Sequence, residues 1–153
     1  MGSLIGQEEV LDRRMQLAAA QFSKCAKLWN TNGISLKTRL RLYNALVIPV
    51  LMYNAGTWAL TGAQSAKLDV FHRRHLRQVL KVRWPRIISN KKLYKACEVK
   101  EPLSAKVGRL RWSLFGHDLR LDEEAPARKT MRLYCDQGKG KRGRPKTTLP
   151  VVL

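Results

Sequence analysis

Apolar side chains at helical spacing are the feature that most constrains the fold of this chain. Over residues 7–29 they recur in alternating steps of four and three, as one face of a helix requires. The same spacing returns in several later segments, and no segment shows a convincing alternation with period two, which a half-buried strand would need. The pattern predicts an all-α fold, a small helical bundle of about five to six helices. The stripe of the first segment consists of Leu11, Met15, Ala18, Phe22, Cys25 and Trp29.

Residues that start or stop helices set the boundaries in the first half of the chain. The stretch "NTNG" at residues 30–33 ends the first helix, and Ser35 can cap the second. Pro49 should kink or end that second helix, because it lacks a backbone donor and its ring clashes with the preceding turn. Thr61 and Gln64 match a capping box, so we expect a third helix to begin there.

The second half of the chain carries similar signals. Trp84 precedes Pro85 and is pushed out of the helical region, so "RWPR" should break the third helix. Ser89 can cap a short helix that runs to residue 98, and Pro102 suits the first turn of a longer helix that reaches about residue 120. A last short helix is expected over residues 127–134. We divide the chain into an N-terminal helical pair (1–60), a second helical region (61–135) and a disordered basic tail (136–153).

The charge of the chain indicates its partner. Thirty Lys and Arg residues stand against eleven Asp and Glu residues, a formal net charge of +19. Such an excess repels itself in a compact chain unless a polyanion neutralises it, which favours nucleic acid. An anionic membrane surface is the alternative, but the apolar run at residues 45–53 is far shorter than the roughly 20 residues of a membrane span. We therefore expect a nucleic-acid partner and no membrane.

The N-terminus and the cysteines bear on the compartment. "MGSLIG" lacks the charged and apolar regions of a secretory signal. Cys25, Cys97 and Cys135 are odd in number and widely spaced, which is typical of reduced thiols. The expected localisation is nuclear or cytoplasmic.

The third expected helix has a basic face opposite its apolar stripe. Lys67, Arg74, Arg77 and Lys81 lie about 180° from that stripe, and Arg73 flanks them. A solvated face is the alternative, but such faces usually mix both signs of charge, and here only Asp69 interrupts. We predict that these cations contact phosphates.

A second basic cluster lies in "KVGRLRW", where Lys106, Arg109 and Arg111 surround an otherwise apolar helix. Trp112 and Phe115 of this helix could stack on bases or riboses. Aromatic residues at helical spacing are more often core residues, and we expect that of this pair.

No catalytic or metal site is expected. His72, His75, His117 and Cys97 contain no paired zinc-ligand spacing, and the histidines follow apolar stripes, which predicts histidines of the core or of an interface. The acidic residues do not form the cluster that two-metal polymerases and nucleases need. The sequence therefore predicts neither a metal nor a cofactor, and no catalytic residues within this chain.

The tail holds one further motif. "KRGRPK" contains the Arg-Gly-Arg-Pro core of an AT-hook, whose arginines enter the narrow minor groove of A·T-rich DNA, and it also reads as a nuclear localisation signal. Its candidate nucleic-acid-binding residues are Lys141, Arg142, Arg144 and Lys146.

Four segments in order carry a resemblance that covers residues 6–148: "KLWNTNGISLKTRLRLYNALVIPVLMYNAGTWALT", "LDVFHRRHLRQVLKVRW", "RLRWSLFGHDLRL" and "GKRGRPKTT". This order resembles the region after the polymerase palm in reverse transcriptases of non-LTR, LINE-like retrotransposons. The resemblance implies thumb and post-thumb helices that grip the RNA template and nascent DNA, followed by a basic extension. It also implies a palm and fingers ahead of residue 1. Family members often have Cys at His75, Gly at Lys81 and Trp at Leu149.

Three functions follow as alternatives. The first is a non-catalytic, nucleic-acid-binding fragment of a retroelement reverse transcriptase. The second is a free-standing DNA-binding module that uses the tail as an AT-hook. The third is a degenerate retroelement relic with no selected function.

Overall fold

The structure is a computed structural model that describes residues 7–136, and within them it is all-α, which confirms the predicted fold class. It contains more helices than expected, because two of the predicted helices are each divided in two. The elements are α1 (Gln7–Lys24), α2 (Ala26–Asn30), α3 (Leu36–Leu46), α4 (Ile48–Leu51), the 3₁₀ turn η1 (Ala55–Thr57), α5 (Gly62–Val79), α6 (Asn90–Ala96), α7 (Leu103–Leu119) and α8 (Pro126–Asp136).

The first division, between α1 and α2, lies at Cys25. In an uninterrupted helix the carbonyl of Phe22 would accept from the amide four residues later. Here it accepts from the Cys25 amide at 3.1 Å and from the indole N–H of Trp29 at 2.8 Å. The indole therefore replaces a helical backbone bond, and the chain turns before α2 begins.

The second division confirms the break expected at Pro49. α3 ends at Leu46, and α4 begins two residues later with Pro49 in its first turn. A proline is tolerated there because the first amides of a helix have no acceptor within the helix.

The predicted helix starts are confirmed in detail. Ser35 accepts from the Thr38 amide at 3.2 Å. Thr61 and Gln64 form the complete capping box: the Gln64 amide donates to Thr61 Oγ1 at 3.3 Å, and the Thr61 amide donates to Gln64 Oε1 at 2.8 Å. Ser89 caps α6.

The end of α5 comes earlier than "RWPR" predicts. α5 stops at Val79, and Lys81 takes a left-handed conformation with φ of 55°. The amides of Lys81 and Val82 donate back to the carbonyls of Gln78 and Arg77, both at 2.9 Å. These two bonds form a Schellman motif, so the helix is already closed three residues before Trp84.

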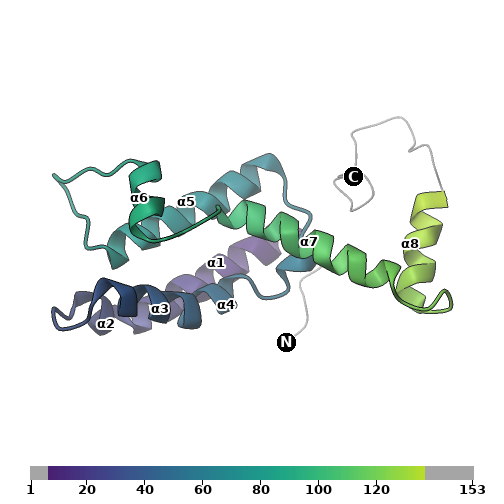
Figure 1. Cartoon of the computed structure of the whole chain (residues 1–153), viewed down its shortest axis with the longest axis horizontal. Coiled ribbons are helices and arrows are strands. Elements are labelled where there is room, and N and C mark those ends of the chain that lie inside the picture. The colour runs from purple at the N-terminus through teal and green to yellow at the C-terminus, as the bar shows by residue number, and fades with distance from the viewer. Residues whose placement is uncertain (1–6, 137–153) are drawn as a thin grey trace.

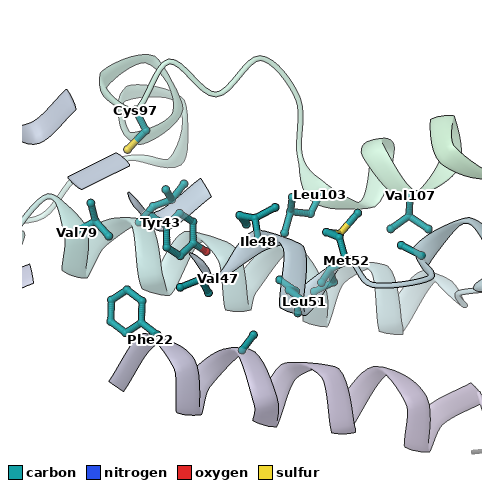
Figure 2. Packing of buried hydrophobic residues seen from close by; sticks show 14 of the residues in the cluster. Phe22, Tyr43, Val47, Ile48, Leu51, Met52, Val79, Cys97, Leu103 and Val107 are labelled. Atoms are coloured by element: carbon teal, nitrogen blue, oxygen red, sulfur yellow. The ribbon is translucent and has the colours of Figure 1, made fainter. Parts of the chain in front are cut away.

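The core lies between α1, α3, α4 and α5, with α6 and the start of α7 covering it (Figure 1). In Figure 2, Tyr43 and Ile48 lie between the helix of Phe22 and the segments of Cys97 and Leu103. Phe22 stacks on Trp29 with ring centroids 4.9 Å apart. This single core draws residues from both sides of position 60, so α1 and α5 are packed on each other rather than set apart.

α7 packs on the bundle at its start and becomes more exposed toward its C-terminal end. Leu103 and Val107 are buried, whereas Leu110 and Leu119 are exposed. η1 packs against the middle of this helix, where an added Cβ on Gly56 would lie 3.4 Å from the Leu110 carbonyl oxygen. Beyond this contact α7 continues toward α8, at the right of Figure 1. Within residues 7–136, no helix combines the length and apolar character needed to cross a membrane.

Candidate nucleic-acid interface

The basic face of α5 contains two arginines without partners. Arg74 is exposed and Arg73 is half-buried. Among residues 7–136, neither guanidinium forms a hydrogen bond or an ion pair with another side chain. No carboxylate in the described part of the chain therefore neutralises either charge.

The other predicted cations of this face are held by contacts within the chain. Lys67 pairs with Asp12 of α1 at 2.5 Å, in a contact where both side chains are about half exposed. An exposed pair of this kind contributes little stability, typically about 0–1 kcal/mol. Lys67 is thus partly neutralised, unlike Arg73 and Arg74.

Arg77 and Lys81 fasten the segments that follow and precede α5. Arg77 Nη2 donates to Asn90 Oδ1 at 2.7 Å. Lys81 Nζ donates to the Asn30 carbonyl at 2.9 Å and to Asn32 Oδ1 at 2.8 Å. Because of these hydrogen bonds, both cations stabilise the local fold in addition to contributing positive charge. Lys81 also lies beyond the end of α5.

Asp69, the one acidic residue of the predicted face, is directed toward α7. Its carboxylate accepts from the Ser104 amide at 3.0 Å and from the Ser104 hydroxyl at 2.6 Å. The N-cap residue of α7 is Pro102, which supplies no side-chain cap. The Asp69 carboxylate therefore satisfies an amide at the positive end of the α7 dipole.

The α7 cluster is less available than its sequence suggests. Arg109 pairs with Glu101 at 2.5 Å. Arg111 is half-buried, burial lowers the pKa of its guanidinium, and its Nη2 has no hydrogen-bond partner within the described part of the chain. Lys106 is half-buried and lies close enough to His72 to influence its titration.

The prediction that Trp112 belongs to the core is wrong. Trp112 is 52% exposed, and it meets Phe115 edge to face with ring centroids 5.9 Å apart. Phe115 is half-buried. Helical spacing correctly placed the two rings on one helix, but the core ends before this part of α7, so no described element covers Trp112.

The histidines divide into two kinds. His72 and His75 are buried, as predicted for core residues, and His117 is exposed on α7. Burial lowers the pKa of His72 to about 4; Asp69 opposes this shift, and the positive charges of Arg73 and Lys106 add to it. Burial also lowers the pKa of His75, whose Nδ1 lies 2.9 Å from the Phe71 carbonyl. In residues 7–136, no three His, Cys, Asp or Glu side chains gather where they could hold a metal ion.

The connection between α5 and α6 contains exposed residues that are not among the predicted interface residues. Trp84 is 89% exposed and Ile87 is 90% exposed. Arg83 and Arg86, on either side of Trp84, are exposed as well. Figure 1 shows this loop extending from the left end of the molecule. The sequence signal for such a site is a tryptophan with an arginine on either side, at a position where the pattern predicts only the end of a helix.

Residues 70–97 comprise most of α5, this loop and α6. They contain nine Lys and Arg residues and no Asp or Glu. The predicted tail residues Lys141, Arg142, Arg144 and Lys146 lie outside the described residues.

Comparison of the chain with protein-family models, with curated proteins and with solved structures gave no match.

Proposed function

We propose that this chain is a non-catalytic, nucleic-acid-binding part of a retroelement reverse transcriptase, corresponding to the thumb and C-terminal extension that grip the template and its product. Binding is to the phosphate backbone and does not depend on base sequence. The observation that carries the proposal is the stretch of residues 70–97, which spans most of α5, the following loop and α6 and contains nine cations and no acid.

The unpaired arginines of α5 support the nucleic-acid part of the proposal. Arg73 and Arg74 have no partner within the described residues, and Asp69, the nearest acid along the chain, is engaged by Ser104. A guanidinium with its donors unused suits a phosphate, which it can contact with two parallel hydrogen bonds.

The conformation of Lys81 supports the assignment to retroelement reverse transcriptases. Its φ of 55° lies in the left-handed region that favours glycine. Members of the family that this chain resembles often have glycine at this position. The backbone at Lys81 therefore has the conformation that the glycine of the resembled family would favour.

The test compares two double variants that remove equal charge. Arg73→Ala with Arg74→Ala should weaken binding to a 20-base-pair RNA–DNA hybrid and reduce the slope of log K against log salt by about 1.4–1.8, because two phosphate contacts are lost. Lys37→Ala with Arg41→Ala is the control, since both residues are exposed on α3, outside residues 70–97. Equal behaviour of the two variants, or an unchanged salt slope, would refute the interface.

A truncated chain ending at Asp136 tests the AT-hook alternative. Under our proposal, truncation lowers affinity equally for A·T-rich and G·C-rich duplexes. A selective loss on A·T-rich duplex would favour the free-standing AT-hook module instead. The relic alternative predicts a molten helical state that binds hydrophobic dye, whereas a functional domain should unfold cooperatively.

A further inference from the structure

The loop between α5 and α6 presents two large apolar side chains to solvent. Trp84 and Ile87 are 89% and 90% exposed, the highest values among the exposed large hydrophobic residues of the described chain. By contrast, Trp29 and Trp58 are buried. An indole with this exposure makes few contacts with its own chain, so packing of this domain does not explain it.

The loop is fastened at both ends, and Arg83 adds a longer contact from Nη2 to Asn30 Oδ1, at 3.4 Å. On the α5 side, Lys81 binds Asn30, the last residue of α2, and Asn32 of the α2–α3 connection. On the α6 side, Arg77 Nη2 donates to Asn90 Oδ1 at 2.7 Å. A tight turn joins the two sides, because the Arg86 amide donates to the Arg83 carbonyl at 3.0 Å. Trp84 occupies a central position of this turn and therefore projects from a supported base.

The positive charges near Trp84 in the sequence indicate which kind of ligand this loop would bind. Arg83 and Arg86 flank Trp84 in the sequence and are exposed, and Lys91, Lys92 and Lys95 follow on exposed positions of α6. No acid occurs anywhere in residues 70–97. A flat aromatic ring among cations is complementary to a strand with bases and phosphates, since the ring stacks on a base while the cations meet the backbone.

We propose that Trp84 stacks on an unpaired base of single-stranded nucleic acid, and that Arg86 contacts an adjacent phosphate. A single strand is favoured over a duplex because paired bases are stacked on each other and offer no free face to an indole. The site rests on the proposed nucleic-acid binding and adds a base-dependent contact to it. It prefers no particular base, because every base has a face on which an indole stacks.

The experiment measures the Kd of Trp84→Ala, Trp84→Phe and Trp84→Leu for three probes: a 20-nucleotide single-stranded DNA of mixed sequence, an abasic strand of equal length, and a 20-base-pair duplex. On the single strand, Trp84→Ala should raise Kd roughly 5- to 140-fold, equivalent to about 1–3 kcal/mol. Trp84→Phe should retain most of the affinity, and Trp84→Leu should behave like Trp84→Ala. The abasic strand and the duplex should not distinguish the variants.

Three results would overturn the site. The first is an unchanged Kd of Trp84→Ala on the single strand. The second is an equal loss on the abasic strand, which has no base for Trp84 to stack on. The third, measured with phosphatidylserine vesicles as a fourth probe, is a loss of binding confined to the vesicles, which would assign the loop to a membrane surface.

The same probes separate the site from the proposed function. If the wild-type chain binds the abasic strand with a steep salt dependence but Trp84→Ala binds like wild type everywhere, only the stacking site fails. If the wild-type chain binds none of the probes, the proposed function and the stacking site both fail.

Discussion

Asp69 of α5 caps α7: its carboxylate accepts from both the backbone amide and the hydroxyl of Ser104, at 3.0 and 2.6 Å. The cap of one helix is thus supplied by another helix, 35 residues earlier in the chain. This contact fixes the start of α7 against the middle of α5.

Removing this cap should destabilise the chain. Asp69→Ala should lower the free energy of unfolding by about 1–2 kcal/mol, because the Ser104 amide loses its acceptor and the α7 dipole loses a nearby negative charge. Ser104→Ala should cost about 1 kcal/mol. Ser113→Ala is the matched control, since Ser113 is exposed on the same helix. Urea denaturation measures all three, and equal stabilities of Ser104→Ala and Ser113→Ala would contradict the cap.

The free energy of unfolding should decrease as the pH is lowered, because His72 is protonated more easily in the unfolded chain than in the folded one. Burial lowers its pKa from 6.5 to about 4. Between these values the unfolded chain binds a proton that the folded chain does not, so the free energy of unfolding decreases as the pH falls, by up to about 3 kcal/mol from this residue. His75 acts in the same direction, because burial lowers its pKa too.

The variants His72→Phe and His117→Gln check the pH dependence. Phe keeps a flat ring beside Tyr43, on which His72 stacks with centroids 5.9 Å apart, and removes the titrating group. Its stability curve should therefore be flatter between pH 6.5 and 4 than that of the wild type. His117→Gln, at an exposed position of α7, is the control for replacing a histidine. Parallel curves for wild type and His72→Phe would contradict the assignment.

A glycine substitution should raise the free energy of unfolding more at Glu98 than at Lys81, the residues with left-handed backbones that close α6 and α5. Glu98 and Lys81 close α6 and α5 with φ values of 53° and 55°. Glu98→Gly should raise the free energy of unfolding by about 0.5–1 kcal/mol, because the left-handed conformation costs a residue with a Cβ more than it costs glycine. Lys81→Gly should gain less, since it also removes the bonds from Nζ to Asn30 and Asn32. Thermal unfolding of both variants gives the order, and the reverse order would show that the Lys81 bonds contribute nothing.

Two cysteines should be protected from thiol reagents. Cys25 and Cys97 are buried and free, and burial raises the pKa of Cys97 to about 11. In a Cys135→Ser chain at pH 8, an aromatic disulfide reagent should modify these thiols only as fast as the chain opens. Modification at the rate of a free thiol in native buffer would contradict the core packing.

The sequence predicts helix boundaries well where the signal is local. The capping box of Thr61 and Gln64 and the break at Pro49 each depend on residues within one helical turn, so spacing alone reveals them. The break at Cys25 depends on the Trp29 indole reaching the Phe22 carbonyl, a choice of side-chain rotamer that helical spacing does not encode.

Whether a charged or aromatic side chain is free to contact a ligand is also hard to predict from the sequence, because it depends on contacts that helical spacing does not encode. Lys67 pairs with Asp12 of α1, and Arg109 pairs with Glu101 of the connection that precedes α7; neither partner is at the helical spacing that a sequence pattern reveals. Trp112 lies on an apolar stripe, but a stripe does not reveal whether another helix covers it. The exposure of Trp84 likewise depends on where the loop is fastened. Asn30 and Asn32, which bind Lys81 at the start of the loop, lie about 50 residues earlier in the sequence.

The packing of α1 has a consequence for synthesis on the ribosome. α1 is made before the helices that cover it, and its apolar stripe is buried only when α4 and α5 pack against it. At about 5–20 residues per second, several seconds pass between the emergence of α1 and that of α5. During that interval the nascent chain displays Leu11 and Phe22 without the helices that cover them, so we expect chaperones to engage this segment first.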